Sequence, residues 1–566
     1  MPSTTVAEAL LARLRTRGVD YLFANGGTDF APVIEGMARA EAAGVALPEA
    51  LVISHETAAV AMAHGYYLVT GRPQAVMVHV NVGLANAVMG LINAATDNVP
   101  MVLCSGRTPV TEQGHLGSRS LPIHWGQEMR DQGAMVREFV KWDYELRSGS
   151  QVETLVDRAL AIAMSEPRGP VYLSLPREVL AEPHEEPAQG AAPVMAASAT
   201  GQPDPAAIAR AAALLAGAER PLIVAQRGDP RAADFEPLAG FAEDWALPVV
   251  EFWPVRNAFA SSHPLHAGYQ AAPWLTEADV VLVLDALVPW VPDQHAPPAG
   301  CKVIQAGPDP LFARTPLRGF RADISLAGET AAVVSALAAA LQPRLAEHQS
   351  KLAERRARVT ASAAEARAAR LASARDGGGT PMSPQWVSLC LSEALGPDAA
   401  VFTELGCDPS VMSLERPGSY FSHALSGGLG WAVPAALGAQ LADRERLVAA
   451  CAGDGSHIFA NPVSCHQIAE AQGLPILTVV FNNGVWNAVR RSTLAMYPDG
   501  QASRMNRMPV TSLAPAPDFV RIVEASRGWG ERVERGEDLP GALARAIEVI
   551  RNERRQALLD VTVAAD

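Results

Sequence analysis

Short apolar runs, each long enough for one buried strand, alternate with stretches of helical periodicity along most of this chain. In its first part, the strand-like runs lie at 21–24, 51–54, 75–80, 101–105 and 171–175. The predicted helices among them lie at 5–17, 57–70 and 84–95. Strands that alternate with helices predict a parallel sheet that is covered by helices on both faces.

The same alternation returns twice further along, so three α/β domains are expected. Apolar runs predict strands of a second domain at 221–225, 247–251, 280–284 and 302–305. In a third domain, strands are predicted at 447–452 and 475–481, and helices at 433–440 and 462–472. We place the domains, each a mostly parallel sheet flanked by helices, at 1–183, 204–342 and 376–566. The predicted linkers, the second a solvated helix, are 184–203 and 343–375.

The composition of the 566 residues is that of a globular protein, with 49% apolar and 19% charged residues. A formal net charge of −14 argues against nucleic acid and anionic membranes as partners, which leaves small molecules and other subunits. The six cysteines form no C-x-x-C pair, the N-terminus shows no signal pattern, and no long uncharged apolar run occurs. These features predict a soluble cytoplasmic protein.

Oxygen-bearing side chains follow two of the predicted strands in the third domain. One apolar run stops at Gly453, Asp454 and Gly455, and the next ends in Asn482 and Asn483. The segment between them has the length of one right-handed βαβ crossover, so Asp454 and Asn483 are expected to meet where open α/β sheets bind ligands. One carboxylate, one amide and a nearby carbonyl are too few for a bare ion. They suit a Mg²⁺ ion that takes its other ligands from a diphosphate and water.

This arrangement resembles the signature of thiamine diphosphate (ThDP) enzymes, in which Gly-Asp-Gly is followed at this spacing by Asn-Asn. Gly-Asp-Gly alone is also typical of a tight strand-to-helix turn, but here both halves of the signature close an apolar strand. The resemblance implies that Asp454, Asn483 and the Val485 carbonyl bind Mg²⁺. The further cofactor contacts that it implies are Gly453, Gly455, Trp486 and Ser456, the last at a helix start beside the diphosphate.

The first domain resembles the pyrimidine-binding domain of the acetolactate synthase, benzoylformate decarboxylase and pyruvate oxidase group. The matching stretches are 23–27, 55–59, 65–71, 86–91 and 169–176. In that family, a Glu at this helix start hydrogen-bonds N1′ of the aminopyrimidine and so promotes loss of the thiazolium C2 proton, which implies that role for Glu56. The helix macrodipole alone would also favour a Glu here. Gly27 is a further expected cofactor contact.

Two glycine-rich stretches of the third domain carry the remaining expected contacts. By local rules, 426–431 is a turn into a helix. By resemblance, Leu429 bends the cofactor and the Gly427 carbonyl accepts a hydrogen bond from N4′. Cys407 and Asp408 depart from the pattern of the family, so only backbone contacts near Gly406 are expected in that stretch.

The choice of reaction depends on the side chains near the reacting carbon. His79 lies where benzoylformate decarboxylases carry an active-site His that relays a proton, although a satisfied sheet His is the alternative. Thr28 lies where the same enzymes have a Ser that holds the substrate carboxylate, or it is only a turn hydroxyl. Trp486, Ala488 and Val489 predict an apolar wall for the substrate or ordinary core packing.

Other stretches favour the synthases. Segments 123–128 and 136–142 resemble the F-Q-E…K loop of acetolactate synthases, where Gln127 is a substrate-side group, a flavin-side group or a surface residue. His115, His124 and Arg119 in this region are either anion contacts or parts of a solvated loop. No G-x-G-x-x-G follows a strand of the second domain, so FAD is possible but has no supporting motif.

These resemblances imply a ThDP- and Mg²⁺-dependent enzyme that makes or breaks the C–C bond next to the carbonyl of a small 2-oxo acid, as an acetolactate synthase-like carboligase/decarboxylase does. The alternatives are a benzoylformate decarboxylase-like enzyme that releases an aldehyde and a 2-hydroxyacyl-thioester lyase. A non-catalytic ThDP-binding paralogue is disfavoured by the presence of Glu56 and Asp454. Because the family draws these two residues of one site from different subunits, we expect a homodimer or homotetramer with active sites between subunits.

Overall fold

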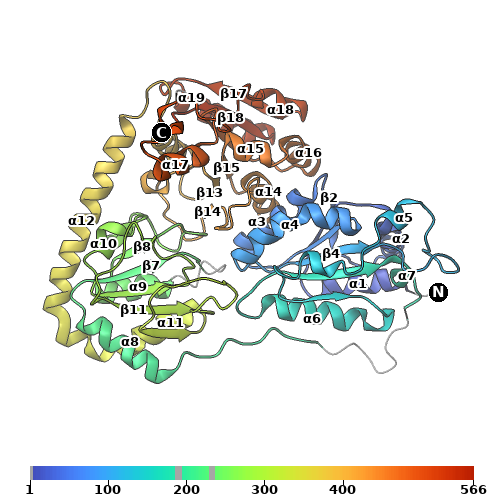
Figure 1. Cartoon of the computed structure of the whole chain (residues 1–566), viewed down its shortest axis with the longest axis horizontal. Coiled ribbons are helices and arrows are strands. Elements are labelled where there is room, and N and C mark those ends of the chain that lie inside the picture. The colour runs from blue at the N-terminus through green and yellow to red at the C-terminus, as the bar shows by residue number, and fades with distance from the viewer. Residues whose placement is uncertain (1–3, 185–193, 229–235, 506, 566) are drawn as a thin grey trace. The chain divides into compact units, whose positions relative to one another are not determined.

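The computed structural model describes residues 4–184, 194–228, 236–505 and 507–565. It contains three sheets of six parallel strands each, with helices packed against them (Figure 1). The chain divides into two compact units, one of which comprises Met1–Ala199, Ala424–Arg444 and Gln467–Leu474. Within the described residues, no helix combines the length and the apolar character needed to cross a membrane. The predicted α/β fold with three parallel sheets is confirmed.

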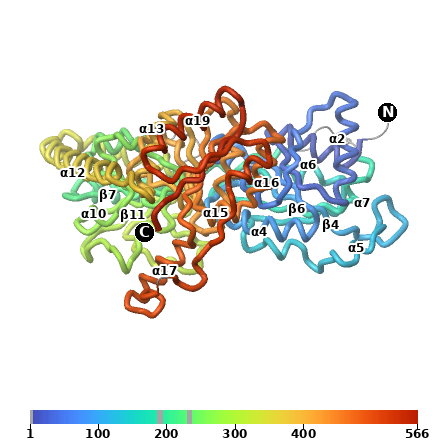
Figure 2. The backbone as a smooth tube through the Cα atoms, turned by 90° about the horizontal axis from the view of Figure 1, so that it is seen from above, coloured from blue at the N-terminus to red at the C-terminus, as the bar shows by residue number. Residues whose placement is uncertain are grey.

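The first sheet lies in this first unit and has the strand order β2-β1-β3-β4-β6-β5. Its strands are β1 (Tyr21–Ala24), β2 (Glu49–Val52), β3 (Ala75–Val78), β4 (Val102–Arg107), β5 (Asp143–Glu145) and β6 (Val171–Pro176). Its helices are α1 (Val6–Thr16), α2 (Ala31–Ala43), α3 (Glu56–Thr70), α4 (Val80–Thr96), α5 (Ile123–Gly126), α6 (Val152–Met164) and α7 (Arg177–Leu180). Strands β4 and β6 lie side by side in the backbone trace (Figure 2).

Helix α1 begins where the sequence predicts because Thr5 and Glu8 form a capping box. The Glu8 N–H donates to the Thr5 hydroxyl, and the Thr5 N–H donates to the Glu8 carboxylate at 2.7 Å. The apolar face of the helix, which includes Leu10, Leu11 and Leu14, is buried in the core of the first domain.

Helix α4 begins earlier than the predicted stretch 84–95. It starts at Val80, so His79 is its N-cap directly after β3. The chain changes from strand to helix within one residue, and Val80 has a φ of 28°. A positive φ is unusual for a β-branched residue. His79 is therefore a junction residue rather than part of the strand.

Helix α14 (Ala432–Ala442) packs against α3 within the first unit. The two helices run antiparallel, because Gly65 lies against Ala435 while Gly438 lies against Met62. A Cβ atom at either glycine would overlap a backbone carbonyl of the other helix. The absence of two side chains therefore permits an unusually close approach of the helices.

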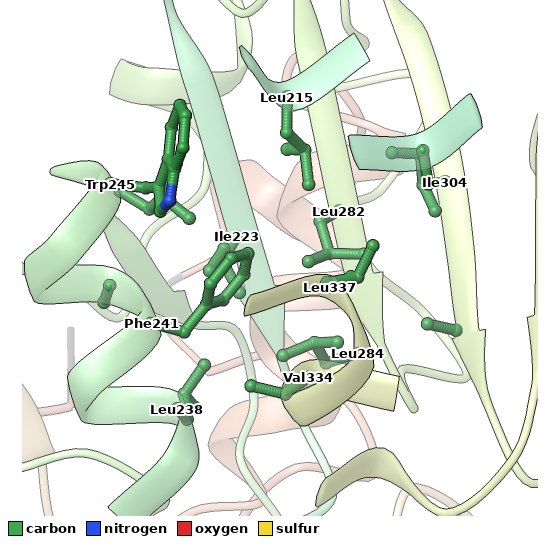
Figure 3. Packing of buried hydrophobic residues seen from close by; sticks show 14 of the residues in the cluster. Leu215, Ile223, Leu238, Phe241, Trp245, Leu282, Leu284, Ile304, Val334 and Leu337 are labelled. Carbon is green, nitrogen blue, oxygen red and sulfur yellow. The ribbon is translucent and has the colours of Figure 1, made fainter. Parts of the chain in front are cut away.

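The second sheet, in the other unit, has the order β12-β11-β10-β7-β8-β9. Its strands are β7 (Pro221–Ala225), β8 (Val249–Glu251), β9 (His266–Gly268), β10 (Val280–Leu284), β11 (Lys302–Gly307) and β12 (Ile324–Ala327). Its helices are α8 (Pro205–Gly217), α9 (Glu236–Trp245), α10 (Ala272–Leu275) and α11 (Thr330–Leu341). Phe241 and Trp245 of α9 pack beside Ile223 and Leu282 of the sheet (Figure 3).

The predicted helical linker contains α12 (Gln349–Arg375). Most of this helix faces solvent, as predicted, but Arg355 is buried and donates to the main-chain carbonyl of Trp245 at 3.1 Å. Leu352 and Val359 are buried as well. The helix is therefore packed against the central domain along one face rather than solvated all round.

The third sheet has the order β14-β13-β15-β16-β18-β17, which repeats the connectivity of the first sheet strand for strand. Its strands are β13 (Ala400–Glu404), β14 (Tyr420–Ser422), β15 (Val448–Gly453), β16 (Leu477–Asn482), β17 (Trp529–Val533) and β18 (Ala557–Thr562). The further helices of this part of the chain are α13 (Pro384–Leu395), α15 (Asp454–Phe459), α16 (Pro462–Gln472), α17 (Asn487–Met496), α18 (Phe519–Ala525) and α19 (Leu539–Glu553).

Candidate active site

Asp454 lies at the carboxyl end of β15, beside the end of the neighbouring parallel strand β16. It is 2% exposed. Its carboxylate accepts the N–H of Gly455 at 2.9 Å and the N–H of Gly484 at 2.8 Å. Burial raises the pKa of Asp454, and these N–H groups oppose the rise. The expected meeting of the two strand ends is thus present in the fold, because Gly484 directly follows Asn483.

Asn483 and its neighbours complete this strand end. The Asn483 side-chain oxygen accepts the N–H of Val485 at 3.0 Å. The indole of Trp486 packs over Gly455, where a Cβ atom would overlap the ring. Glycine is therefore required beneath this side chain.

The donor set at this end fits a Mg²⁺ ion that is shared with a diphosphate. Among the residues that the structure describes, no three His, Cys, Asp or Glu side chains gather as a metal cluster. Asp454, the Asn483 amide and a backbone carbonyl are hard oxygen ligands, which Mg²⁺ prefers, and they leave most coordination positions to other groups.

The loop after β13 explains the unexpected Asp408. Its carboxylate accepts the N–H of Ser410 at 2.9 Å and the amide of Gln385 at 3.3 Å. It therefore caps the 3-10 turn that follows. Gly406 lies against the Cys451 backbone, where a Cβ atom would be 3.0 Å from the carbonyl.

Glu56 is the first residue of α3 in the first domain, and His55 before it caps the helix. The Glu56 side chain is half-buried, and its Oε2 accepts the Asn86 amide at 3.1 Å. Its Oε1 faces Gly83 of α4, where a Cβ atom would be 3.2 Å away. The carboxylate is thus oriented by one amide and given space by one glycine.

His79 has polar partners on both ring nitrogens. Nδ1 is 2.5 Å from the Asp29 carboxylate, and Nε2 is 3.2 Å from the Gln127 amide nitrogen. The hydrogen bond to Asp29 raises the pKa of His79, burial opposes this, and the charge of Glu56 adds to the rise. Both ring nitrogens of His79 thus have a polar partner, one of them a buried carboxylate.

Asp29 is a site residue that sequence reasoning missed. It follows Thr28 in a turn after β1, where aspartate is common for conformational reasons alone. The usable signal was a carboxylate in the same turn as two other candidate residues, Gly27 and Thr28. Thr28 itself is exposed, and its carbonyl accepts a hydrogen bond from Arg177 at 3.2 Å. Gly27 lies against the His79 ring, which a Cβ atom would overlap.

The glycine-rich turn before α14 is held by Asn93 of α4. The Asn93 amide donates to the Gly428 carbonyl at 2.9 Å, and its oxygen accepts from the Ser426 hydroxyl at 2.7 Å. Gly427 has a φ of 70°, which glycine adopts without strain. Leu429 is half-buried. The turn that carries the last expected cofactor contacts is therefore ordered by the first domain.

The histidines and the arginine in the loop that contains Gln127 have different surroundings. His124 is buried, and its Nδ1 accepts the N–H of Ser120 at 3.1 Å. Burial lowers the pKa of His124, and Arg177 adds to this effect, so the side chain supports the loop as a neutral group. His115 is exposed. Arg119 forms an ion pair with Glu128.

Polar side chains thus lie at the carboxyl ends of two parallel sheets, which is where α/β enzymes bind their ligands. Three family models match the chain: the thiamine pyrophosphate enzyme N-terminal binding domain at 4–135, the central domain at 208–337 and the C-terminal binding domain at 405–561. The protein belongs to the thiamine pyrophosphate (ThDP) enzymes. The predicted resemblance is thereby confirmed.

Relatives with different activities share this architecture. An acetolactate synthase of Mycobacterium bovis is 27% identical over 96% of this chain and 86% of its own length. A benzoylformate decarboxylase of Pseudomonas aeruginosa is 28% identical over 96% of both chains. The solved structure of a ThDP-dependent 4-hydroxybenzoylformate decarboxylase of Rhodococcus jostii covers 99% of both chains with a TM-score of 0.75 and 24% identity, which shows a common fold.

Proposed function

We propose that this protein is a ThDP- and Mg²⁺-dependent decarboxylase of a small 2-oxo acid that releases the corresponding aldehyde. The observation that carries the proposal is His79, which is paired with the buried Asp29 in the same domain as Glu56. A His supported in this way is suited to deliver a proton to carbon. The decarboxylases among the relatives and neighbours support the same reaction class.

The cofactor contacts are part of the proposal. Asp454, Asn483 and the Val485 carbonyl would hold Mg²⁺, while Glu56 would hydrogen-bond the aminopyrimidine. The other residues proposed to line the cofactor are Gly27, Gly406, Gly427, Leu429, Gly453, Gly455, Ser456 and Trp486. Bound ThDP supplies an electron sink for the charge left on the carbonyl carbon when CO₂ departs.

His79 would supply the proton that takes the place of CO₂ on the reacting carbon. When CO₂ leaves, the electrons of the broken C–C bond stay with the former carbonyl carbon, and a proton from His79 Nε2 would form the new C–H bond. The raised pKa keeps His79 protonated to higher pH than a free histidine, so that it can act as an acid near neutral pH. Thr28 is proposed to contact the substrate carboxylate, which its exposure allows.

Carboligation of the acetolactate synthase kind is the second candidate. Gln127 favours it, because its amide nitrogen lies 3.2 Å from His79 Nε2, and an N–H donor there pairs with the unprotonated Nε2 and so opposes transfer of a proton from it to carbon. The carbon that has lost CO₂ would then add to the carbonyl of a second 2-oxo acid or an aldehyde. The relationship to an acetolactate synthase is consistent with this outcome.

We also propose at least a homodimer with shared active sites. The antiparallel packing of α3 and α14 places Glu56 and Leu429 of one chain on opposite sides of the helix crossing, each roughly 10 Å from it. One cofactor that contacts a Glu56 and a Leu429 would therefore draw them from two chains. Light scattering after size exclusion tests this proposal, and a monomer that is fully active would contradict it.

The decisive experiment identifies the carbon product. The purified protein is incubated with ThDP, Mg²⁺ and one of pyruvate, 2-oxobutyrate, phenylpyruvate or benzoylformate, and CO₂ is followed while the product is identified by mass spectrometry. An aldehyde alone supports the decarboxylase, and a 2-hydroxy ketone supports the carboligase. Absence of ThDP-dependent CO₂ release from all four acids would contradict both. Glu56→Gln serves as the control for cofactor activation.

A further inference from the structure

Asp29 is buried at 2% exposure, and both of its carboxylate oxygens are directed at the same junction. Oδ1 lies 2.5 Å from Nδ1 of His79, and Oδ2 accepts the N–H of Val80 at 3.2 Å. One carboxylate thus binds the side chain of one residue and the backbone of the next. This bidentate arrangement fixes the ring and the start of α4 together.

Two glycines provide the space for this pair. A Cβ atom at Gly106, near the end of β4, would overlap the Asp29 carboxylate, and a Cβ atom at Gly27 would overlap the His79 ring. The pair therefore occupies a volume that no other residue type at these two positions would leave open. The carboxylate and the ring are therefore both closely packed against backbone that cannot carry a side chain.

The backbone at the junction is strained. Val80 is buried and has a φ of 28°, a conformation that is strained for a β-branched residue. Its N–H is the group that Asp29 binds. Backbone strain that neighbouring interactions maintain is concentrated at functional sites.

We propose that Asp29 is the positioning residue of His79: it holds the imidazole with the proton on Nδ1 and leaves Nε2 to exchange a proton with the reacting carbon. This inference deepens the proposed function and rests on it for the identity of the reaction. The role is analogous to that of a carboxylate that orients a catalytic histidine through the nitrogen remote from the substrate. Asp29 itself does not touch substrate.

The charge on Asp29 also sets the range of pH in which His79 carries its proton. The charged and titratable groups near His79 are Asp29 on the turn after β1, Glu56 on α3 and His124 on α5. The charges of Arg119 and Arg177 act on His124. Of these, Asp29 makes the largest contribution, and it favours the charged imidazolium. Gln127 is the neutral group on Nε2, and its own side-chain oxygen is buried without a partner among the described residues.

The first test is independent of turnover. Histidine labelled with ¹³C and ¹⁵N is incorporated into the full chain, the His79 signals are assigned with His79→Gln, and tautomer and titration are followed by NMR. In the wild type, neutral His79 is expected to carry its proton on Nδ1 and to titrate above free histidine. In Asp29→Asn, which keeps the shape of the side chain, the midpoint is expected to move to lower pH. An unchanged midpoint and tautomer would overturn the inference.

The second test uses the pH profile of kcat. Loss of the Asp29 charge is expected to lower kcat by about 10- to 100-fold with little change in KM, and to move the alkaline limb of the profile to lower pH. In the His79→Gln background, Asp29→Asn is expected to add almost no further loss, because the residue acts through His79. A full additional loss in that background would contradict a positioning role.

Two further variants separate geometry from charge. Gly106→Ala leaves the charge in place but displaces the carboxylate, and it is expected to disturb the His79 tautomer as well. Glu153→Gln removes the carboxylate that lies 2.7 Å from Nε2 of another buried histidine, His184, and is expected to leave kcat and its pH profile unchanged. Equal effects of Glu153→Gln and Asp29→Asn would overturn the inference. Thermal unfolding of each variant confirms that it is folded.

The two proposals fail in different ways. If no 2-oxo acid is turned over while Asp29→Asn still moves the titration of His79, the proposed reaction is wrong and the pairing stands. If turnover is found but the titration and the profile of Asp29→Asn match the wild type, the reaction stands and the positioning role of Asp29 is wrong.

Discussion

The first and third sheets have the same strand order, but their carboxyl ends carry different kinds of polar groups. At the third sheet, Asp454 and Asn483 are held by backbone N–H groups of the turns themselves. At the first sheet, Asp29, His79 and Gln127 are held by one another. Two sheets of the same topology thus differ at their carboxyl ends. The third sheet has polar side chains held by backbone N–H groups, and the first has titratable side chains held by one another.

Corresponding loops show the same contrast at the level of single residues. Asp29 follows the strand that occupies the place of β13 in the first sheet, and Asp408 follows β13 itself. Asp29 accepts from His79, whereas Asp408 caps its own turn through the N–H of Ser410. A carboxylate after the same strand of the same topology therefore binds a histidine side chain in one domain and caps its own turn in the other.

The largest expected effect is at the first sheet. Glu56→Gln should lower kcat by about 10²–10⁴-fold, because the amide cannot act as the carboxylate partner of the aminopyrimidine. Binding of ThDP, measured by calorimetry, should change far less. A Gln variant with full activity would contradict the proposed activation and remove the functional contrast between the two sheets.

At the third sheet, substitution should affect binding rather than chemistry. Asp454→Ala should raise the Mg²⁺ concentration needed for half-maximal activity by more than roughly 100-fold, because even the loss of a residue that only hydrogen-bonds a metal ligand costs about 10- to 100-fold in affinity. Activity should return in part at high Mg²⁺ and ThDP. A variant that keeps the wild-type Mg²⁺ titration would show that Asp454 does not bind Mg²⁺.

The contributions of His466, near the third sheet, and of His79, at the first sheet, to the unfolding free energy should depend on pH in opposite directions. His466 is a buried residue of α16, and burial lowers its pKa to about 4. The unfolding free energy is therefore unaffected by His466 above its unfolded pKa of about 6.5. It decreases as the pH falls from there towards the folded pKa, because protonation then favours the unfolded state. Between pH 7.5 and 4.5, the wild type should lose on the order of 2–3 kcal/mol more unfolding free energy than His466→Gln. Equal losses by urea denaturation would refute this.

For His79 the sign is reversed and the effect is smaller. Its pKa is raised in the folded state, so its contribution to stability is present below the unfolded value and is lost as the pH rises through the folded one. Asp29→Asn should therefore destabilise the protein by about 1 kcal/mol at pH 5.5 and by less at pH 9. Denaturant unfolding at the two pH values provides the measurement, and a larger cost at pH 9 would contradict it.

The positions of several strands can be predicted from the sequence, because they depend on the local pattern of apolar residues. The runs at β1, β7 and β10 predict those strands with the observed bounds, and the crossover length between β15 and β16 predicts that their carboxyl ends meet, as they do. The strands β5, β9, β12 and β14 are not predicted, since three or four residues carry little periodicity. The longer strands β13, β17 and β18 are not predicted either.

What the sequence does not show are pairings between distant residues. Asp29 and His79 are fifty positions apart and meet only because β1 and β3 are neighbours in the sheet. Likewise, no local rule reveals that Gly65 and Gly438 face carbonyls of each other's helices. Such contacts depend on the tertiary arrangement, which propensity and spacing do not encode.

The antiparallel crossing of α3 and α14 has a genetic consequence. If Glu56 of one chain serves the cofactor that is anchored by Asp454 of another, then Glu56→Gln and Asp454→Ala damage different halves of a shared centre. Two inactive proteins, mixed and reassembled, would form hybrids in which one centre carries both lesions and the other carries none. After random mixing, about a quarter of all centres would carry no lesion, so that two null alleles would complement each other.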